Sequence, residues 1–118
     1  MPVDVTRERF EELVESALDG IPDQLASLVQ NLVVLVEETP PAGEPRDLLG
    51  LYDGYALTER DSFMAAALPD RIFVFRQPLQ QMCRDEAHLI EEVRITVVHE
   101  VAHHFGMDHD TLHALGYG

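Results

Sequence analysis

The C-terminal third of the chain carries a helical repeat that leads directly into a cluster of histidines. From about Asp85 onward, apolar residues recur every three or four positions, the spacing that places them on one face of an α-helix. Glycine commonly follows the end of a helix because it adopts the left-handed conformation without penalty, and Gly106 follows this repeat. We therefore predict a long helix from about residue 85 to Gly106. Its apolar residues are Leu89, Ile90, Val93, Val97, Val98, Val101, Ala102 and Phe105.

The last part of this predicted helix contains histidines with the spacing of metal ligands. The segment HEVAHHFGMDHD, residues 99–110, holds four of the six histidines of the chain. His99 and His103 are about one helical turn apart, so both imidazoles can bind one ion from the same face. Gly106 lets the chain leave the helix, so that His109 can bring a third nitrogen to the ion. Three protein ligands and one open position are typical of a catalytic zinc site.

The residue after the first histidine is a carboxylate, which gives this site a candidate general base. Glu100 would lie beside the ion, where it could take a proton from a zinc-bound water whose pKa is lowered to about 7. The complete pattern is H-E-x-x-H followed by G-x-x-H, the longer signature of zinc proteases. A surface helix with scattered histidines is the alternative, but six fixed positions arise by chance in such a chain with odds on the order of 10⁻⁵. We therefore predict one zinc ion per chain.

Segments beyond the zinc motif resemble the small bacterial family of zincin-like metallopeptidases. They are LLGLYDGYALTERD, LPDRIFVFRQPL, the helix into HEVAHHFG, and LHALGYG, and they extend over residues 48–118. The resemblance implies an α+β fold, a minimal zincin. In this fold a small twisted mixed sheet of about three to four strands packs against the helix with the zinc histidines, together with N-terminal helices. We expect residues 1–118 to form a single domain of this kind.

Two departures from related zinc proteases leave parts of the site open. In the family that the chain resembles, the third ligand is often Asp, and Asp108 here precedes His109. Spacing favours His109, with Asp108 as the alternative ligand. Metzincins also place a Met-containing turn beneath the zinc, but none of the nine residues after His109 is Met. Tyr117 and Gly106 are then candidate supports for the site. Tyr117 could equally be an ordinary packed aromatic.

The remaining histidines and the single cysteine give weaker indications of function. His104 lies off the ligand face of the helix, and His88 is about 16 Å from His99 along the axis, too far to share an ion. Cys83 cannot form an intrachain disulfide, which fits a reducing cytoplasm. With no second cysteine in the chain, we expect Cys83 to be a small packed residue.

Helical and extended patterns alternate upstream of the long helix. Residues 7–19 have helical apolar spacing, with Thr6 as the N-cap and Gly20 as the stop, and a short helix could follow from Pro22. Strands are expected over residues 31–38, in short pieces around a turn near Asp53–Gly54, and over 71–77, where Pro78 would end the strand. A last short helix could follow residue 110. Zincins bind extended substrates along an edge strand, here either 71–75 or 51–57, unless both are simply core strands.

The composition limits the partners of such a domain. The formal net charge is −14, from 22 acidic and 8 basic residues. Nucleic-acid binding needs a basic surface, and an anionic membrane would repel this chain. The sequence shows no signal peptide and no membrane-spanning stretch, so we expect a cytoplasmic protein. The sequence allows, but does not require, a homodimer in which the partner subunit completes the substrate cleft.

The most favoured function is a zinc-dependent peptidase that acts on peptides or proteins, with Glu100 as general base. One alternative is a catalytically weak or inactive metal-binding or interaction protein, which the missing Met-turn and the small size allow. The other is a metal-dependent endoribonuclease. The spacing H-x-x-x-H-x-x-G-x-x-H also resembles the bacterial ribosomal-RNA maturation endonucleases, which lack the Glu after the first His. Both Glu100 and the acidic composition argue against that family.

Overall fold

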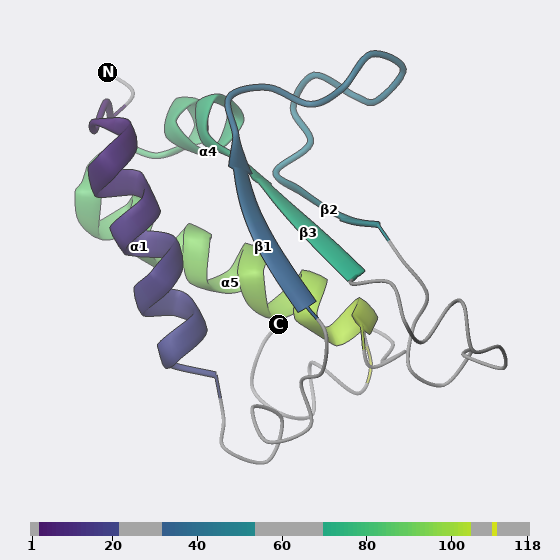
Figure 1. Ribbon diagram of the computed structural model, residues 1–118. Coiled ribbons are helices and arrows are strands. Elements are labelled where there is room, and N and C mark those ends of the chain that lie inside the picture. Colours follow the sequence, from purple (N-terminus) through teal and green to yellow (C-terminus); the bar gives the residue numbers. More distant parts are fainter. Residues whose placement is uncertain (1–2, 22–31, 54–69, 105–109, 111–118) are drawn as a thin grey trace, which may run out of the picture.

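The computed structural model describes residues 3–21, 32–53, 70–104 and 110. Within these ranges, three helices pack on a three-stranded sheet, and this confirms the predicted α+β fold class. In chain order the elements are α1 (Arg7–Asp19), β1 (Leu32–Glu37), β2 (Gly50–Asp53), β3 (Asp70–Phe75), α4 (Arg76–Met82) and α5 (Glu86–His104). Figure 1 shows α5 running behind the sheet and α1 lying beside β1. The helix that carries the predicted zinc histidines is therefore backed by the sheet.

The sheet is mixed, with β3 in its centre. β1 pairs with β3 in parallel, and β2 pairs with β3 antiparallel. The strand order excludes one of the two strands suggested as the edge along which substrate binds. β3 is hydrogen-bonded on both sides, so a substrate cannot pair with it as a further strand. The suggestion that residues 71–75 bind substrate was therefore wrong. Among the described strands, β2 is the edge strand that lies against α5.

The core lies between the sheet and the two long helices. Ile72 and Val74 of β3 are fully buried, and they share one apolar cluster with side chains of α1 and α5. From α1 this cluster takes Phe10, Leu13, Val14 and Ala17, and from α5 it takes Leu89, Val93, Val97 and Val101. Each Val, Leu, Ile or Phe side chain contributes roughly 1.5–3 kcal/mol when it is fully buried. This cluster holds α5 in a fixed position against the sheet.

The predicted ends of the first helix are confirmed. The Thr6 hydroxyl accepts a hydrogen bond of 3.1 Å from the Arg9 N–H, and the Gly20 N–H donates to the Ser16 carbonyl at 3.1 Å. The start of α5 is capped in the same manner, since the Asp85 carboxylate accepts from the backbone N–H of His88 at 2.8 Å. The predicted helices after Pro22 and after residue 110 lie outside the described residues.

The third predicted strand ends earlier than expected. β3 stops at Phe75, and Arg76 and Gln77 open α4 instead of continuing the strand. Pro78 therefore lies in the first turn of a helix, where its missing N–H costs nothing because that position has no helical partner. Cys83 follows α4 and is 2% exposed, which confirms that it is a packed residue. Burial raises the pKa of its thiol.

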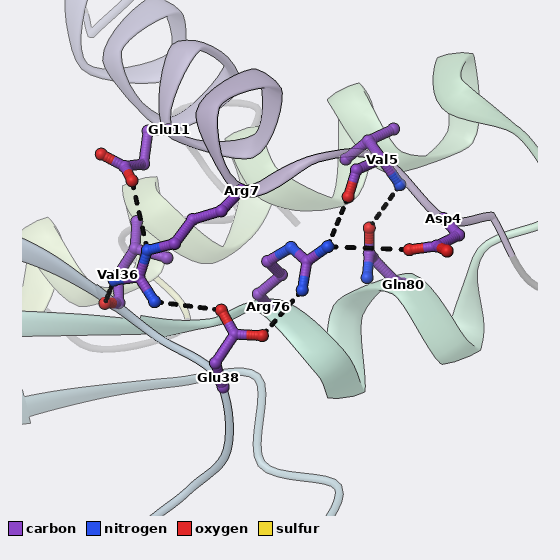
Figure 2. A network of polar contacts seen from close by, with 8 residues as sticks. All are labelled: Asp4, Val5, Arg7, Glu11, Val36, Glu38, Arg76 and Gln80. Atoms are coloured by element: carbon purple, nitrogen blue, oxygen red, sulfur yellow. Dashed lines mark hydrogen bonds and ion pairs between the residues drawn. The ribbon is translucent and has the colours of Figure 1, made fainter.

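A network of polar contacts joins the N-terminal segment to the end of the sheet (Figure 2). Arg76 lies at its centre, with 15% of its side chain exposed, and donates to Glu38 at 2.7 Å and to the Val5 carbonyl. The Val5 N–H donates to the Gln80 side chain at 2.7 Å, and Arg7 donates to the same Glu38 carboxylate at 3.0 Å. These bonds stabilise the irregular backbone before α1.

None of the described helices is long and apolar enough to span a lipid bilayer.

Candidate active site

The C-terminal end of α5 brings three of the predicted site residues together. His99 is half-buried, Glu100 is 9% exposed, and the side chain of His103 is 49% exposed. This placement follows from the helical repeat, because Val97, Val98, Val101 and Ala102 face the core and leave the histidines at its border. The helix thus presents two imidazoles about one turn apart.

The other predicted site residues fall outside the part of the chain that the structure describes. They are Gly106, Asp108, His109 and Tyr117, together with the side chain of His104. Within the described ranges, no three His, Cys, Asp or Glu side chains form a group that could hold a metal ion. The described part of the site supplies two of the three predicted ligands. His88 is far from both, in the first turn of α5, where its Nδ1 accepts from the Arg84 N–H at 3.2 Å.

Glu100 and His103 contact one another directly. The Oε1 atom of Glu100 lies 3.1 Å from Nδ1 of His103. Burial raises the pKa of the Glu100 carboxyl above its ordinary value, while the charge and the hydrogen bond of His103 oppose that rise. A carboxylate with a raised pKa is better suited to accept and return a proton near neutral pH. The contact also engages Nδ1, so that Nε2 is the nitrogen of His103 that could bind an ion.

A groove of about 430 Å³ runs beside this pair, between α5 and the segment that leads into β2. His99 and Glu100 form part of its α5 wall. The other residues of that wall are Glu92, Ile95 and Thr96, and the opposite wall consists of Pro45, Asp47, Leu48, Leu49 and Gly50. A second hollow of about 440 Å³, between α1 and β1, contains no histidine among its described lining residues. Of these two hollows, the groove along α5 is the one that borders the candidate catalytic residues.

Gly50, the first residue of β2, allows the strand to approach α5 closely at this point. A Cβ atom on Gly50 would lie 2.7 Å from Thr96 Cγ2 and 3.2 Å from Glu100 Cγ. Only glycine fits there without moving the helix or the strand. The sequence patterns did not single out this residue, although a glycine within a predicted strand is a known signal for close backbone approach.

Tyr52, two residues further along β2, was also missed. Its ring packs against His103 with the centroids 6.2 Å apart and the planes at 64°, an edge-to-face arrangement. Its hydroxyl donates to the Asp70 carboxylate, which is 2% exposed. No local pattern pointed to this contact, because it depends on how β2 pairs with β3.

The donor chemistry described so far fits a zinc ion. Two imidazoles with helical spacing, a carboxylate beside them and an adjoining groove are what a catalytic zinc site requires from one helix.

No curated protein matches the chain. A conserved hypothetical protein from T. thermophilus has a similar solved structure, with a TM-score of 0.60 over 93% of this chain and 99% of that chain. The two sequences are 24% identical, so this likeness shows a shared fold.

The family described as zincin-like metallopeptidase matches residues 29–118, which is most of the sequence. This match agrees with the resemblance seen in the zinc motif and in the segments from residue 48 onward. It also contains β1, β2, β3, α4 and α5 in full. The chain belongs to the zincin-like metallopeptidase family.

Proposed function

We propose that this protein is a zinc-dependent peptidase in which Glu100 acts as the general base. His99, His103 and His109 would hold one zinc ion, with Asp108 as the alternative third ligand. When bound, zinc supplies a Lewis acid and lowers the pKa of a water molecule. The observation that carries the proposal is the burial of Glu100 in the groove wall, in contact with His103.

The environment of Glu100 suits two successive proton transfers. The carboxylate first takes a proton from the attacking water and later gives it to the departing amine of the cleaved peptide. Because burial raises its pKa, Glu100 holds this proton more firmly between the two steps than an exposed carboxylate would. His103 opposes this rise in pKa and so favours the ionised carboxylate, the form that can accept the proton.

The substrate would be a peptide in extended conformation along β2. Gly50 at the start of this strand lines the groove, and Glu100 lies on the opposite wall. A peptide that adds to the edge of β2 would pass close to the Glu100 carboxylate. The net charge of −14 argues for a peptide and against a nucleic acid, whose phosphates need cationic side chains.

Glu100→Gln tests the proposed role directly. Glutamine keeps the shape of the side chain but cannot accept the proton, so peptide hydrolysis should fall by about 10²- to 10⁴-fold with zinc still bound. Glu91→Gln is the matched control, because Glu91 is exposed on the same helix and pairs with Arg94 away from the groove. Hydrolysis that continues in Glu100→Gln at the wild-type rate would refute this mechanism. Zinc binding without any hydrolysis by the wild type would indicate a metal-binding protein instead.

A further inference from the structure

The side of β2 that faces α5 carries an aromatic residue that contacts both a buried carboxylate and a candidate zinc ligand. The Tyr52 hydroxyl donates to Asp70, the first residue of β3, while the Tyr52 ring meets the imidazole of His103 edge to face. Tyr52 lies opposite Ile72 in the antiparallel register, so its backbone is fixed by the β2–β3 pairing. Asp70 is 2% exposed and is thus a firm anchor for the hydroxyl.

We propose that Tyr52, held in place by Asp70, is a positioning residue that orients the His103 imidazole for metal binding. The inference rests on the proposed zinc site and assigns a role to two residues outside the zinc motif. The order of contacts is Asp70 to the Tyr52 hydroxyl, the Tyr52 ring to the His103 ring, and His103 Nδ1 to Glu100.

The exposure of His103 explains why it needs this support. About half of its side chain, 49%, is exposed, so packing against the core does not fix the ring. Metal binding requires one ring orientation, and a ring that is free to rotate loses entropy when the ion binds. Glu100 holds the ring at one nitrogen, and Tyr52 limits its rotation from the side of the sheet. The two contacts together leave the ring with little freedom before the ion arrives.

The hydroxyl of Tyr52 matters because it directs the ring. An aromatic side chain without a polar anchor can tilt about its χ angles, whereas a hydrogen bond to a buried carboxylate fixes its far end. The contact between the Tyr52 and His103 rings is weaker than a hydrogen bond to the ligand, so its loss should lower zinc affinity by about 3- to 10-fold.

Zinc affinity and the His103 ring can be measured in four variants beside the wild type. Zinc dissociation constants are obtained by competition with a chromophoric chelator, and folding is checked by circular dichroism. Long-range ¹H–¹⁵N spectra of the zinc-free proteins report the imidazole of His103 separately. Tyr52→Ala removes the ring, and Tyr52→Phe keeps the ring but releases it from Asp70. Leu51→Ala is the control on the neighbouring position of β2, whose side chain points to the opposite face of the sheet, and His103→Ala is the reference without the ligand.

The proposal predicts a graded loss. Tyr52→Ala should weaken zinc binding by about 3- to 10-fold, and Tyr52→Phe by a smaller factor of about 2 to 3, both with altered His103 signals. Leu51→Ala should bind zinc as tightly as the wild type. Unchanged zinc affinity and unchanged His103 signals in both Tyr52 variants would overturn the proposal, as would an equal loss in Leu51→Ala. If Tyr52→Ala does not fold, Tyr52→Phe decides the question alone.

The failure of this inference differs from the failure of the proposed function. If the wild type binds no zinc, or if His103→Ala binds it equally well, the zinc site itself is refuted. The spectra of the zinc-free protein then still show whether Tyr52 orients the His103 ring. If the wild type binds zinc, only His103→Ala loses it, and the His103 signals are unchanged in both Tyr52 variants, the zinc site stands and the role of Tyr52 is refuted.

Discussion

Replacement of Gly50 by alanine is a sharp test of how the sheet positions the candidate active site. The added Cβ would lie 2.7 Å from Thr96 Cγ2, whereas ordinary contacts begin at 3.4 Å, so one of the two atoms must move by about 0.7 Å. Thr96 cannot easily yield, because it is 6% exposed and β-branched side chains in helices have few alternative rotamers. The strand or α5 must therefore shift.

Both stability and function should respond to this shift. Overpacking of this kind costs about 1–3 kcal/mol, and the lower chain entropy of unfolded alanine offsets about 0.4–1 kcal/mol of that cost. We expect a net loss of about 1–2 kcal/mol, equivalent to roughly 4–8 °C in Tm for a domain of this size. Because Glu100 Cγ lies 3.2 Å from the same Cβ position, hydrolysis should fall by about 10- to 100-fold as the carboxylate is displaced.

Gly20→Ala provides the matched control for this experiment. A Cβ there would meet only ordinary contacts, at 3.5 Å from the Ser16 carbonyl oxygen and 3.7 Å from that of Ala17, and the φ angle of −90° suits alanine. It should leave Tm unchanged or raise it slightly. Thermal unfolding followed by circular dichroism measures both variants. If Gly50→Ala is as stable and as active as the wild type, the inferred close contact between β2 and α5 is wrong.

Two further predictions concern the polar network near the N-terminus. Arg76→Gln should lower the free energy of unfolding by about 1–3 kcal/mol in urea titrations, because Glu38 and the Val5 carbonyl lose their shared donor; wild-type stability would contradict that role. Burial alone raises the pKa of Glu38, but hydrogen bonds and charge from Arg76, with help from Gln77 and Arg7, bring it below its ordinary 4.5. A carboxyl group whose pKa is lower in the folded state stabilises the fold at pH values above its unfolded-state pKa. This contribution is lost as the pH falls through its folded-state pKa. As the pH is lowered below about 4.5, the urea midpoint should therefore fall more steeply in the wild type than in Glu38→Gln. Parallel curves for the two proteins would argue against the ion pair.

The features that the sequence predicted correctly are those set by local spacing. The apolar repeat of α5 and the helix ends at Thr6 and Gly20 need only neighbouring residues to be recognised. They are confirmed in the described residues, except that Ile90 of the repeat is 45% exposed. The pairing of His99 with His103 follows from the same helical geometry. Richness in β-branched residues also distinguished β1 from the helices.

The features that were missed depend on contacts between distant segments. Gly50 and Tyr52 reach α5, and Asp70 reaches Tyr52, because β2 pairs antiparallel with β3. No single-sequence pattern specifies that order of strands. The change from strand to helix at Arg76 has a similar cause. Its side chain is held by Glu38 and by the N-terminal backbone, and these partners lie 38 and 71 residues away in the chain. Tertiary contacts therefore override the extended pattern of residues 71–77.

Zinc content and affinity of the purified protein, measured for the wild type beside His103→Ala, test the central claim most directly. The proposed site predicts one zinc ion per wild-type chain and a large loss of affinity in His103→Ala, because one of three nitrogen ligands is removed. Absence of zinc from the wild type, or equal weak binding by both proteins, would contradict a zinc site at the end of α5 and with it the proposed peptidase.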